Sequence, residues 1–191
     1  MRIVFFGSPG SGKGTQAARI AQRYDLTHIS TGELFRSKVL DDTRIGRRIG
    51  HVIAAGQLVD DITTNYVLFK ALDGMKRFLV DGYPRNVAQA RSFDVHLQNL
   101  NLELTCALFL DVPEEEAVRR LSLRRNIRQE KKENHQRADD EPEVIHRRFQ
   151  VYRRATEPLV EYYGDRMVAV DGTGDADQVT ARILEVLKPW E

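Results

Sequence analysis

A glycine-rich turn near the start of the chain constrains the fold more than any other feature of the sequence. The apolar run at residues 3–6 leads into Gly7-Ser-Pro-Gly10-Ser-Gly12-Lys13-Gly14-Thr15, and a pattern typical of a helix begins at Lys13. Glycines let backbone N–H groups turn inward around an anion, and the N-terminus of the helix adds its positive end at the same place. A strand, a turn and a helix in this order predict an α/β unit that cradles phosphate.

The spacing Gly7-x₄-Gly12-Lys13 fits the P-loop pattern of proteins that bind ATP or GTP. The lysine of this pattern reaches the β and γ phosphates, and a hydroxyl nearby binds Mg²⁺. Gly14 stands after the lysine, where the general pattern has Ser or Thr, so Thr15 is the candidate hydroxyl. We expect the phosphates to lie against Gly10, Ser11, Gly12, Lys13, Gly14 and Thr15.

Alternating apolar runs and helix-like segments predict the rest of the architecture. Strands are expected at residues 3–6, 28–30, 77–81, 104–111 and 167–171. Helices are expected to begin near Lys13, Gly32, Arg44, Asp61, Val87, Pro113, Pro142 and Asp175. The pattern indicates an α/β fold, a parallel sheet of about five strands flanked by helices, with ligands bound beyond the carboxyl ends of the strands.

The composition limits which binding partners and which cellular compartment can be expected for this chain. The 191 residues carry a net charge of +1, which gives no reason to expect a nucleic-acid or membrane partner. The single cysteine, Cys106, excludes an internal disulfide and is expected to be a small buried hydrophobe. No signal-peptide pattern or apolar stretch of membrane-spanning length is present, so we expect a cytoplasmic protein. Nothing marks an obligate interface, and a monomer is expected.

The segment 119–154 departs from the near-neutral charge of the chain as a whole. It holds twelve Lys/Arg against six Asp/Glu, and residues 126–136 contain one apolar side chain, Ile127. Such a piece cannot bury itself, and we expect it to be exposed and mobile. A charge run is usually a solvated face, but arginines on both sides of a polar excursion in a phosphate-binding chain favour contact with the ligand.

Four further motifs make the chain resemble the nucleoside monophosphate kinases, whose P-loop also has glycine after the lysine. Residues 29–36 (ISTGELFR) resemble the monophosphate-binding motif of that family, and residues 56–59 (GQLV) resemble its base-pocket turn. Residues 81–85 (DGYPR) resemble the central signature, and Arg137-Ala138-Asp139-Asp140 with Arg148 resembles the return of the lid. Within the family the motifs are most similar to those of adenylate kinases with a short lid.

The resemblance implies a P-loop NTPase fold and reversible phosphoryl transfer from Mg·ATP to AMP, giving two ADP, a reaction of purine nucleotide homeostasis and salvage. It implies catalytic roles for Lys13, Arg85, Arg124, Arg137 and Arg148. It implies ATP contacts by Arg120 and Arg124, with Gly174 near the adenine. It implies AMP contacts by Thr31, Arg36, Gln57, Leu58, Val59, Gly82, Tyr83, Pro84, Arg85, Gln89, Arg137 and Arg148.

The resemblance also divides the single domain 1–191 into parts. It implies a core (1–29, 60–124 and 137–191), a helical AMP-binding segment (30–59) and a lid (125–136). Asp81 resembles the carboxylate that orients Mg²⁺ through water, beside Thr15, although the end of a strand could equally use it as a cap. The lid lacks the cysteines of zinc-bearing lids and His135 has no second ligand nearby, so no structural zinc is expected. Which lid residues touch ATP stays open.

Two amide side chains give conflicting indications of which base the acceptor site binds. Asn86 follows Arg85, as in pyrimidine monophosphate kinases, whereas Gln89 is the amide expected to read an adenine edge. We give Gln89 more weight, and Thr31 also fits adenine, so AMP is favoured over UMP or CMP. Two further alternatives are a non-catalytic P-loop module that binds nucleotides or nucleic acid and a small-metabolite kinase, which leaves Gln57, Val59 and Gln89 without a role.

Overall fold

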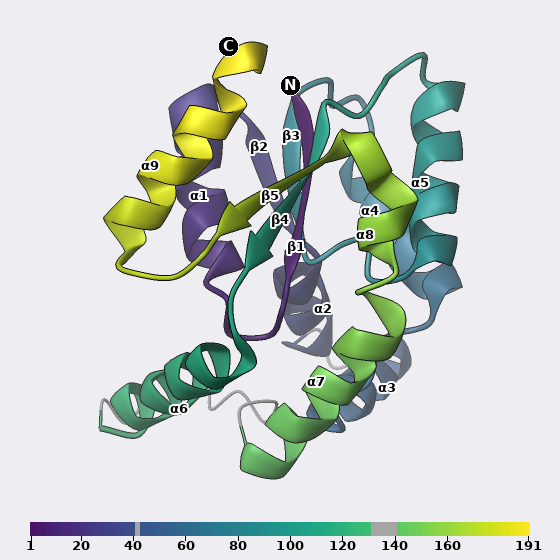
Figure 1. Cartoon of the computed structure of the whole chain (residues 1–191). Helices are drawn as coiled ribbons and strands as arrows, with labels where there is room; N and C mark the ends of the chain where they lie inside the picture. The colour runs from purple at the N-terminus through teal and green to yellow at the C-terminus, as the bar shows by residue number, and fades with distance from the viewer. Residues whose placement is uncertain (41–42, 131–140) are drawn as a thin grey trace.

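Five parallel strands form one sheet in the computed structural model, which describes residues 1–40, 43–130 and 141–191 (Figure 1). The sheet has the order β2-β3-β1-β4-β5, and every neighbouring pair is parallel. The strands are β1 (Arg2–Gly7), β2 (Thr27–Ser30), β3 (Phe78–Asp81), β4 (Cys106–Asp111) and β5 (Met167–Asp171). The predicted α/β class and parallel sheet are confirmed.

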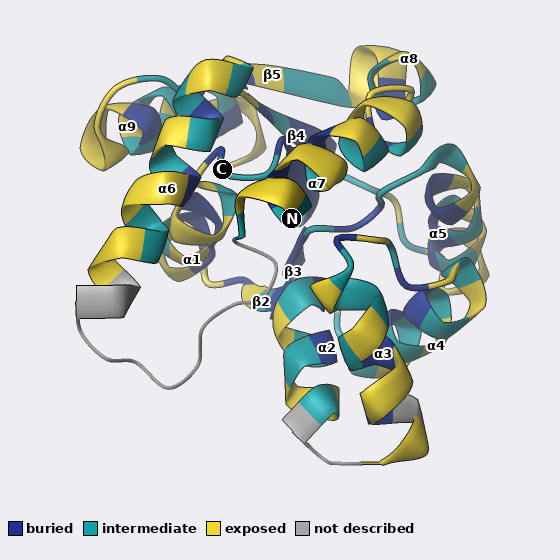
Figure 2. Cartoon of the chain, turned by 90° about the horizontal axis from the view of Figure 1, so that it is seen from below, coloured by how far each residue is buried: buried dark blue, intermediate teal, exposed yellow. Residues whose placement is uncertain are grey.

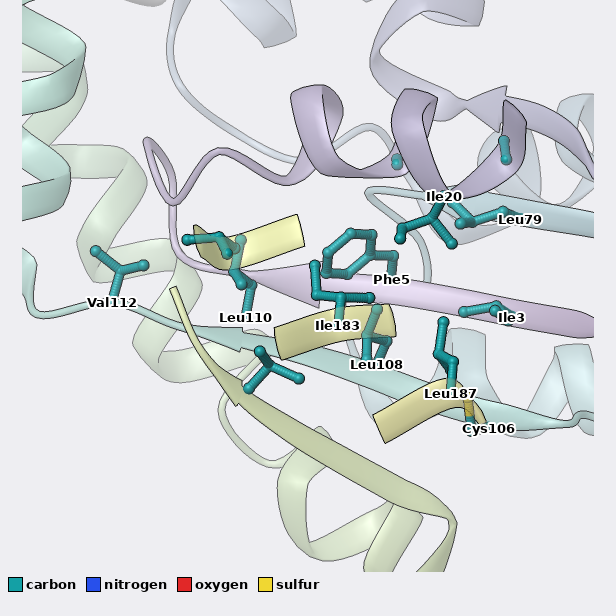
Figure 3. Packing of buried hydrophobic residues seen from close by; sticks show 14 of the residues in the cluster. Ile3, Phe5, Ile20, Leu79, Cys106, Leu108, Leu110, Val112, Ile183 and Leu187 are labelled. Carbon is teal, nitrogen blue, oxygen red and sulfur yellow. The ribbon is translucent and has the colours of Figure 1, made fainter. Parts of the chain in front are cut away.

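Helices cover both faces of the sheet, which explains why the central strands are apolar without alternation. Ile3 and Phe5 of β1 belong to a core that includes α1 (Lys13–Tyr24) and α9 (Ala176–Leu187), part of which is drawn in Figure 3. Val4 and Phe6, on the opposite face, pack in a second core. That core includes α4 (Asp61–Ala71), α5 (Val87–Asn99) and α8 (Leu159–Tyr163).

The four remaining α-helices of the described chain gather beyond the carboxyl ends of the strands (Figures 1 and 2). They are α2 (Thr31–Leu40), α3 (Arg44–Ala54), α6 (Glu114–Glu130) and α7 (Pro142–Ala155). The pair α2 and α3 has a small core of its own, formed by Phe35, Ile49 and Val59. The predicted AMP-binding segment therefore has a small core of its own, although Leu34 of α2 also packs against the second main core.

Several boundaries differ from the prediction for local reasons. The fourth strand begins at Cys106, two residues later than predicted; just before it, the Arg2 backbone N–H donates to Thr105 Oγ1 at 2.8 Å. Helix α8 escaped prediction, since five residues are too short to show a helical period. Helix α6 continues to Glu130, so residues 125–130 of the predicted lid are helical, and residues 131–136 lie outside the described part.

Cys106 is a buried free cysteine, as expected. It lies at the start of β4 within the core shared with α9, and burial raises the pKa of its thiol to about 12. A thiol with so high a pKa is inert at neutral pH, because the thiolate is the reactive form.

Leu108 offers a direct measure of how much the sheet core stabilises the fold. It is fully buried in the middle of β4, so Leu108→Ala should lower the free energy of unfolding by about 2–5 kcal/mol. Urea denaturation followed by circular dichroism measures this loss. Leu123→Ala is the matched control: Leu123 is 46% exposed on α6, and we expect a change of about 0.5 kcal/mol or less. Equal losses in the two variants would contradict the assignment of the core.

Candidate functional site

A cavity of roughly 570 Å³ opens at the carboxyl edge of the sheet. The P-loop, α2, the turn before Val59, the segment after β3, α6 and α7 all contribute to its walls. The sequence-predicted residues that line it are Gly10, Gly12, Lys13, Gly14, Thr15, Thr31, Arg36, Gln57, Leu58, Val59, Asp81, Gly82, Arg85, Gln89, Arg120, Arg124 and Arg148. Segments far apart in the sequence thus meet at one place, as parallel strands require.

The P-loop approaches α6 so closely that only glycine fits at position 10. Gly10 has a φ of +83°, and a Cβ built there would lie 2.4 Å from the Ala117 carbonyl oxygen. Ser11 is buried and does not line the cavity. The close approach fixes the P-loop against the helix that carries Arg120 and Arg124.

Lys13 folds over the P-loop and is surrounded by other cations. Its Nζ donates to the carbonyl oxygens of Gly7 (2.9 Å) and Ser8 (2.8 Å). Burial lowers the pKa of Lys13 from 10.5 to about 8, Asp81 acts in the opposite sense, and three arginines lower it further, namely Arg85, Arg148 and Arg124. The site therefore holds a concentrated positive charge that an anion would relieve.

Arg120 joins the P-loop to the loop after β5. Its guanidinium donates to the carbonyl oxygens of Ser11 (3.1 Å), Gly172 (3.0 Å) and Gly174 (3.3 Å), and Glu116 accepts from its Nε at 2.7 Å. The structure thus brings Arg120 and Gly174 together, although Gly174 does not line the cavity.

On the opposite side of the cavity, the carbonyl oxygen of Gly82 organises two predicted site residues. It accepts from Thr31 Oγ1 at 3.0 Å and from Arg85 Nε at 2.8 Å. The neighbouring Tyr83 and Pro84 do not line the cavity. Tyr83 is completely buried, and burial, with the charges of Asp61 and Asp94, raises its pKa. Its side chain supports the segment from behind rather than facing a ligand.

Helix α7 packs directly on the turn that carries Gln57 and Val59. Gly56 in that turn has a φ of +69°, and a Cβ on it would lie 2.9 Å from Val144 Cγ1. Arg147 donates to the Ala55 carbonyl oxygen at 3.1 Å. The helix that carries Arg148 is therefore in direct contact with the turn beside the cavity.

Asp81 ends β3 beside the P-loop and is 8% exposed. A Cβ on Gly14 would lie 3.5 Å from its Oδ2, so the carboxylate faces the start of α1. Thr15 also lines the cavity. A carboxylate and a hydroxyl are hard oxygen donors, which suit Mg²⁺ shared with phosphate oxygens.

One predicted catalytic residue, Arg137, lies outside the described residues. The cavity also contains residues that the sequence did not single out individually: Pro9, Ser30, Gly32, Glu33, Phe35, Ile53, Gly56, Thr64 and Leu121. Most of them lie next to or within a recognised motif, and this proximity was the one feature of the sequence that could have identified them. Asp61 was read only as the start of a helix, yet its Oδ1 accepts from Asn86 Nδ2 and from Gln89 Nε2.

Comparison with known proteins gives a consistent result over the whole chain. Residues 5–168 match the family model described as adenylate kinase. A protein named adenylate kinase from Sinorhizobium medicae is 41% identical over 192 residues, covering 98% of this chain and all of the relative. One with the same name from Petrotoga mobilis is 36% identical over 212 residues, covering all of this chain and 99% of the relative.

The lowered pKa of Lys13 predicts proton uptake when a polyphosphate binds. Near pH 9 much of Lys13 is neutral in the free protein, and bound phosphate should raise its pKa and restore the charge. Affinity for ATP should therefore fall as pH rises through about 8. Isothermal titration calorimetry at pH 9, in two buffers of different ionisation enthalpy, measures the protons taken up. Lys13→Met should abolish the uptake; equal uptake in the variant would contradict this origin.

Proposed function

The chain belongs to the adenylate kinase family and transfers a phosphoryl group between ATP and AMP, and we propose that the cavity at the carboxyl edge of the sheet is where it does so. The observation that carries this assignment is the convergence of Lys13, Arg85, Arg124 and Arg148 on that cavity. A phosphoryl group in transfer spreads negative charge over its oxygens, and four fixed cations suit that charge.

The ATP half of the site is proposed to lie between the P-loop and α6. Backbone N–H groups of the glycine turn and Lys13 would hold the phosphates, and Arg124 would reach them from α6. The base would lie toward Arg120, whose guanidinium is positioned by hydrogen bonds to carbonyl oxygens of two loops. The cavity lining supports this placement with Gly10, Gly12, Lys13, Gly14, Thr15, Arg120 and Arg124, whereas Ser11 and Gly174 do not line it.

The AMP half is proposed to lie between α2 and the start of α5. Thr31, Arg36, Gln57, Leu58 and Val59 come from the segment that has its own small core, and Gln89 closes the opposite wall. Arg85 lies between the two halves in the cavity lining, which suits contact with both phosphates. Arg137 is proposed to complete the site, with Arg148.

The reaction needs no covalent bond to the protein. A phosphate oxygen of AMP attacks the γ-phosphorus of ATP, the bond to the β-γ bridging oxygen breaks, and two ADP leave. The arginines position the two phosphates in line and stabilise the charge, because a guanidinium binds two phosphoryl oxygens at once and stays ionised. When bound, Mg²⁺ neutralises charge on the phosphates, and we propose Asp81 and Thr15 as its protein-side donors.

Exclusion of water would protect the transferred group from hydrolysis. The AMP-binding segment and the lid are proposed to close over the cavity, and the contact of α7 with Ala55 and Gly56 supports coupling between the two sides. We propose a monomer. No helix of the described residues is long and apolar enough to cross a bilayer. We propose a cytoplasmic location.

Removal of either central arginine should damage turnover far more than folding. Arg85→Ala and Arg148→Ala should each lower kcat by about 10²–10³-fold, because each removes a fixed cation from the transferred phosphoryl group. Steady-state formation of ADP from ATP and AMP measures the loss, and circular dichroism checks the fold. Arg91→Ala is the matched control, since Arg91 is exposed on α5 and does not line the cavity. Full turnover in both test variants would refute the assigned site.

The acceptor nucleotide distinguishes this function from the related pyrimidine kinases. We expect kcat/KM for AMP to exceed the values for CMP and UMP, since the smaller pyrimidine leaves space in a wall built from Thr31, Val59 and Gln89. Parallel assays with ATP and each acceptor measure the ratio. Equal or higher efficiency with UMP or CMP would contradict the proposed reading of the base.

A further inference from the structure

We propose that Asp61, which lies behind the cavity wall, determines which bases the acceptor site takes by fixing the orientation of the Gln89 carboxamide. The inference rests on the proposed role of Gln89 in the AMP half of the site. It goes further by naming a positioning residue and by predicting discrimination between 6-amino and 6-oxo bases.

Two opposite contacts fix the Gln89 side chain, which is 1% exposed. Its Nε2 donates to Asp61 Oδ1 at 2.8 Å, and its Oε1 accepts from the Arg85 backbone N–H at 2.8 Å. A carboxylate oxygen can only accept here and a backbone N–H can only donate. If the amide turned over, two acceptors would face each other at one end and two donors at the other, so both bonds would be lost.

The same carboxylate removes Asn86 from competition for the base. Asn86 Nδ2 donates to Asp61 Oδ1 at 2.9 Å, and its Oδ1 accepts from the Gln89 backbone N–H at 2.8 Å as the N-cap of α5. Both ends of this amide are thus engaged within the protein, and Asn86 does not line the cavity. The residue that resembled a pyrimidine kinase in sequence has a structural role.

The backbone of Gln89 also has a contact within the protein. The Tyr83 hydroxyl lies 2.9 Å from the Gln89 carbonyl oxygen and 2.7 Å from Asn65 Oδ1, so α4 supports α5 at this point through a second contact. Asp61 and Asn65 are one helical turn apart on α4: Asp61 contacts the Gln89 side chain, and Asn65 contacts the Tyr83 hydroxyl that lies against the Gln89 carbonyl oxygen.

With its amide fixed, Gln89 retains one Nε2 hydrogen and one Oε1 lone pair for a ligand. This donor–acceptor pair complements a base edge that presents an amino donor beside a ring-nitrogen acceptor, as adenine does. In a 6-oxo purine the order along that edge is reversed, with an oxygen acceptor beside an N–H donor. A fixed amide cannot reverse in response, so the site should take AMP and reject IMP, a purine of nearly the same size.

The test compares AMP with IMP as acceptors in wild type and Asp61→Leu. Leucine branches at Cγ as aspartate does but has no acceptor, so the Gln89 amide is released. The ratio of kcat/KM for AMP to that for IMP should fall by about 5- to 150-fold, the range of one bidentate base contact, while KM for ATP stays unchanged. An unchanged ratio, or an equal rise in KM for both nucleotides, would overturn the proposal.

Two further variants separate positioning from damage to the helix. Asp60→Leu removes the N-cap of the same helix, whose carboxylate accepts from the Thr63 N–H, without touching Gln89, so it should keep the wild-type ratio. Asp61→Asn keeps an oxygen acceptor and should retain most of the discrimination. A lowered ratio in Asp60→Leu would instead show that fraying of α4 is the cause.

Failure of the inference can be told from failure of the proposed function. Gln89→Leu should lower the ratio of AMP to IMP in the same way, and the double variant with Asp61→Leu should add little, because both act through one amide. If Gln89→Leu keeps wild-type discrimination, the proposed role of Gln89 fails. If Gln89→Leu loses discrimination but Asp61→Leu keeps it, only the role of Asp61 fails.

Discussion

The concentration of positive charge at one edge of the sheet is the constraint on which the rest of the structure depends. Lys13 lies in an environment where burial and neighbouring arginines both disfavour its charge, and Asp81 and the carbonyl oxygens of Gly7 and Ser8 oppose them. Such a site is costly without an anion, so the stability of the protein has to come from elsewhere. The two apolar cores on either face of the sheet supply it.

The helices fall into two groups by position. Helices α1, α9, α4 and α5 pack on the sheet, whereas α2, α3, α6 and α7 lie beyond the strand ends (Figures 1 and 2). Both groups contribute side chains to the cavity, including Lys13 of α1 and Gln89 of α5. The pair α2 and α3 has a small core, and it is connected to the rest of the molecule: Val67 of α4 packs against that core, and Leu34 of α2 packs against the second main core.

The network around Gln89 shows how a wall of the cavity is made precise. One carboxylate and one backbone N–H define the orientation of the Gln89 carboxamide, and one buried hydroxyl contacts the main-chain carbonyl of the same residue. Few groups face the ligand, but the groups that fix their orientation come from two helices and the segment after β3. Positioning residues of this kind have no motif of their own, because their position depends on the packing of those elements.

Local sequence patterns were enough to predict the strands, most helix starts and the P-loop, because each depends on neighbouring residues: an apolar run, a cap, a glycine turn. The arginines could be recognised by resemblance, and four of the five cations predicted to be catalytic line one cavity, while Arg137 lies outside the described residues. The short helix α8, the inward direction of Tyr83 and the anchoring of Gln89 by Asp61 could not be predicted in this way. They depend on contacts between segments far apart in the sequence, and only the packed tertiary structure determines which polar groups meet.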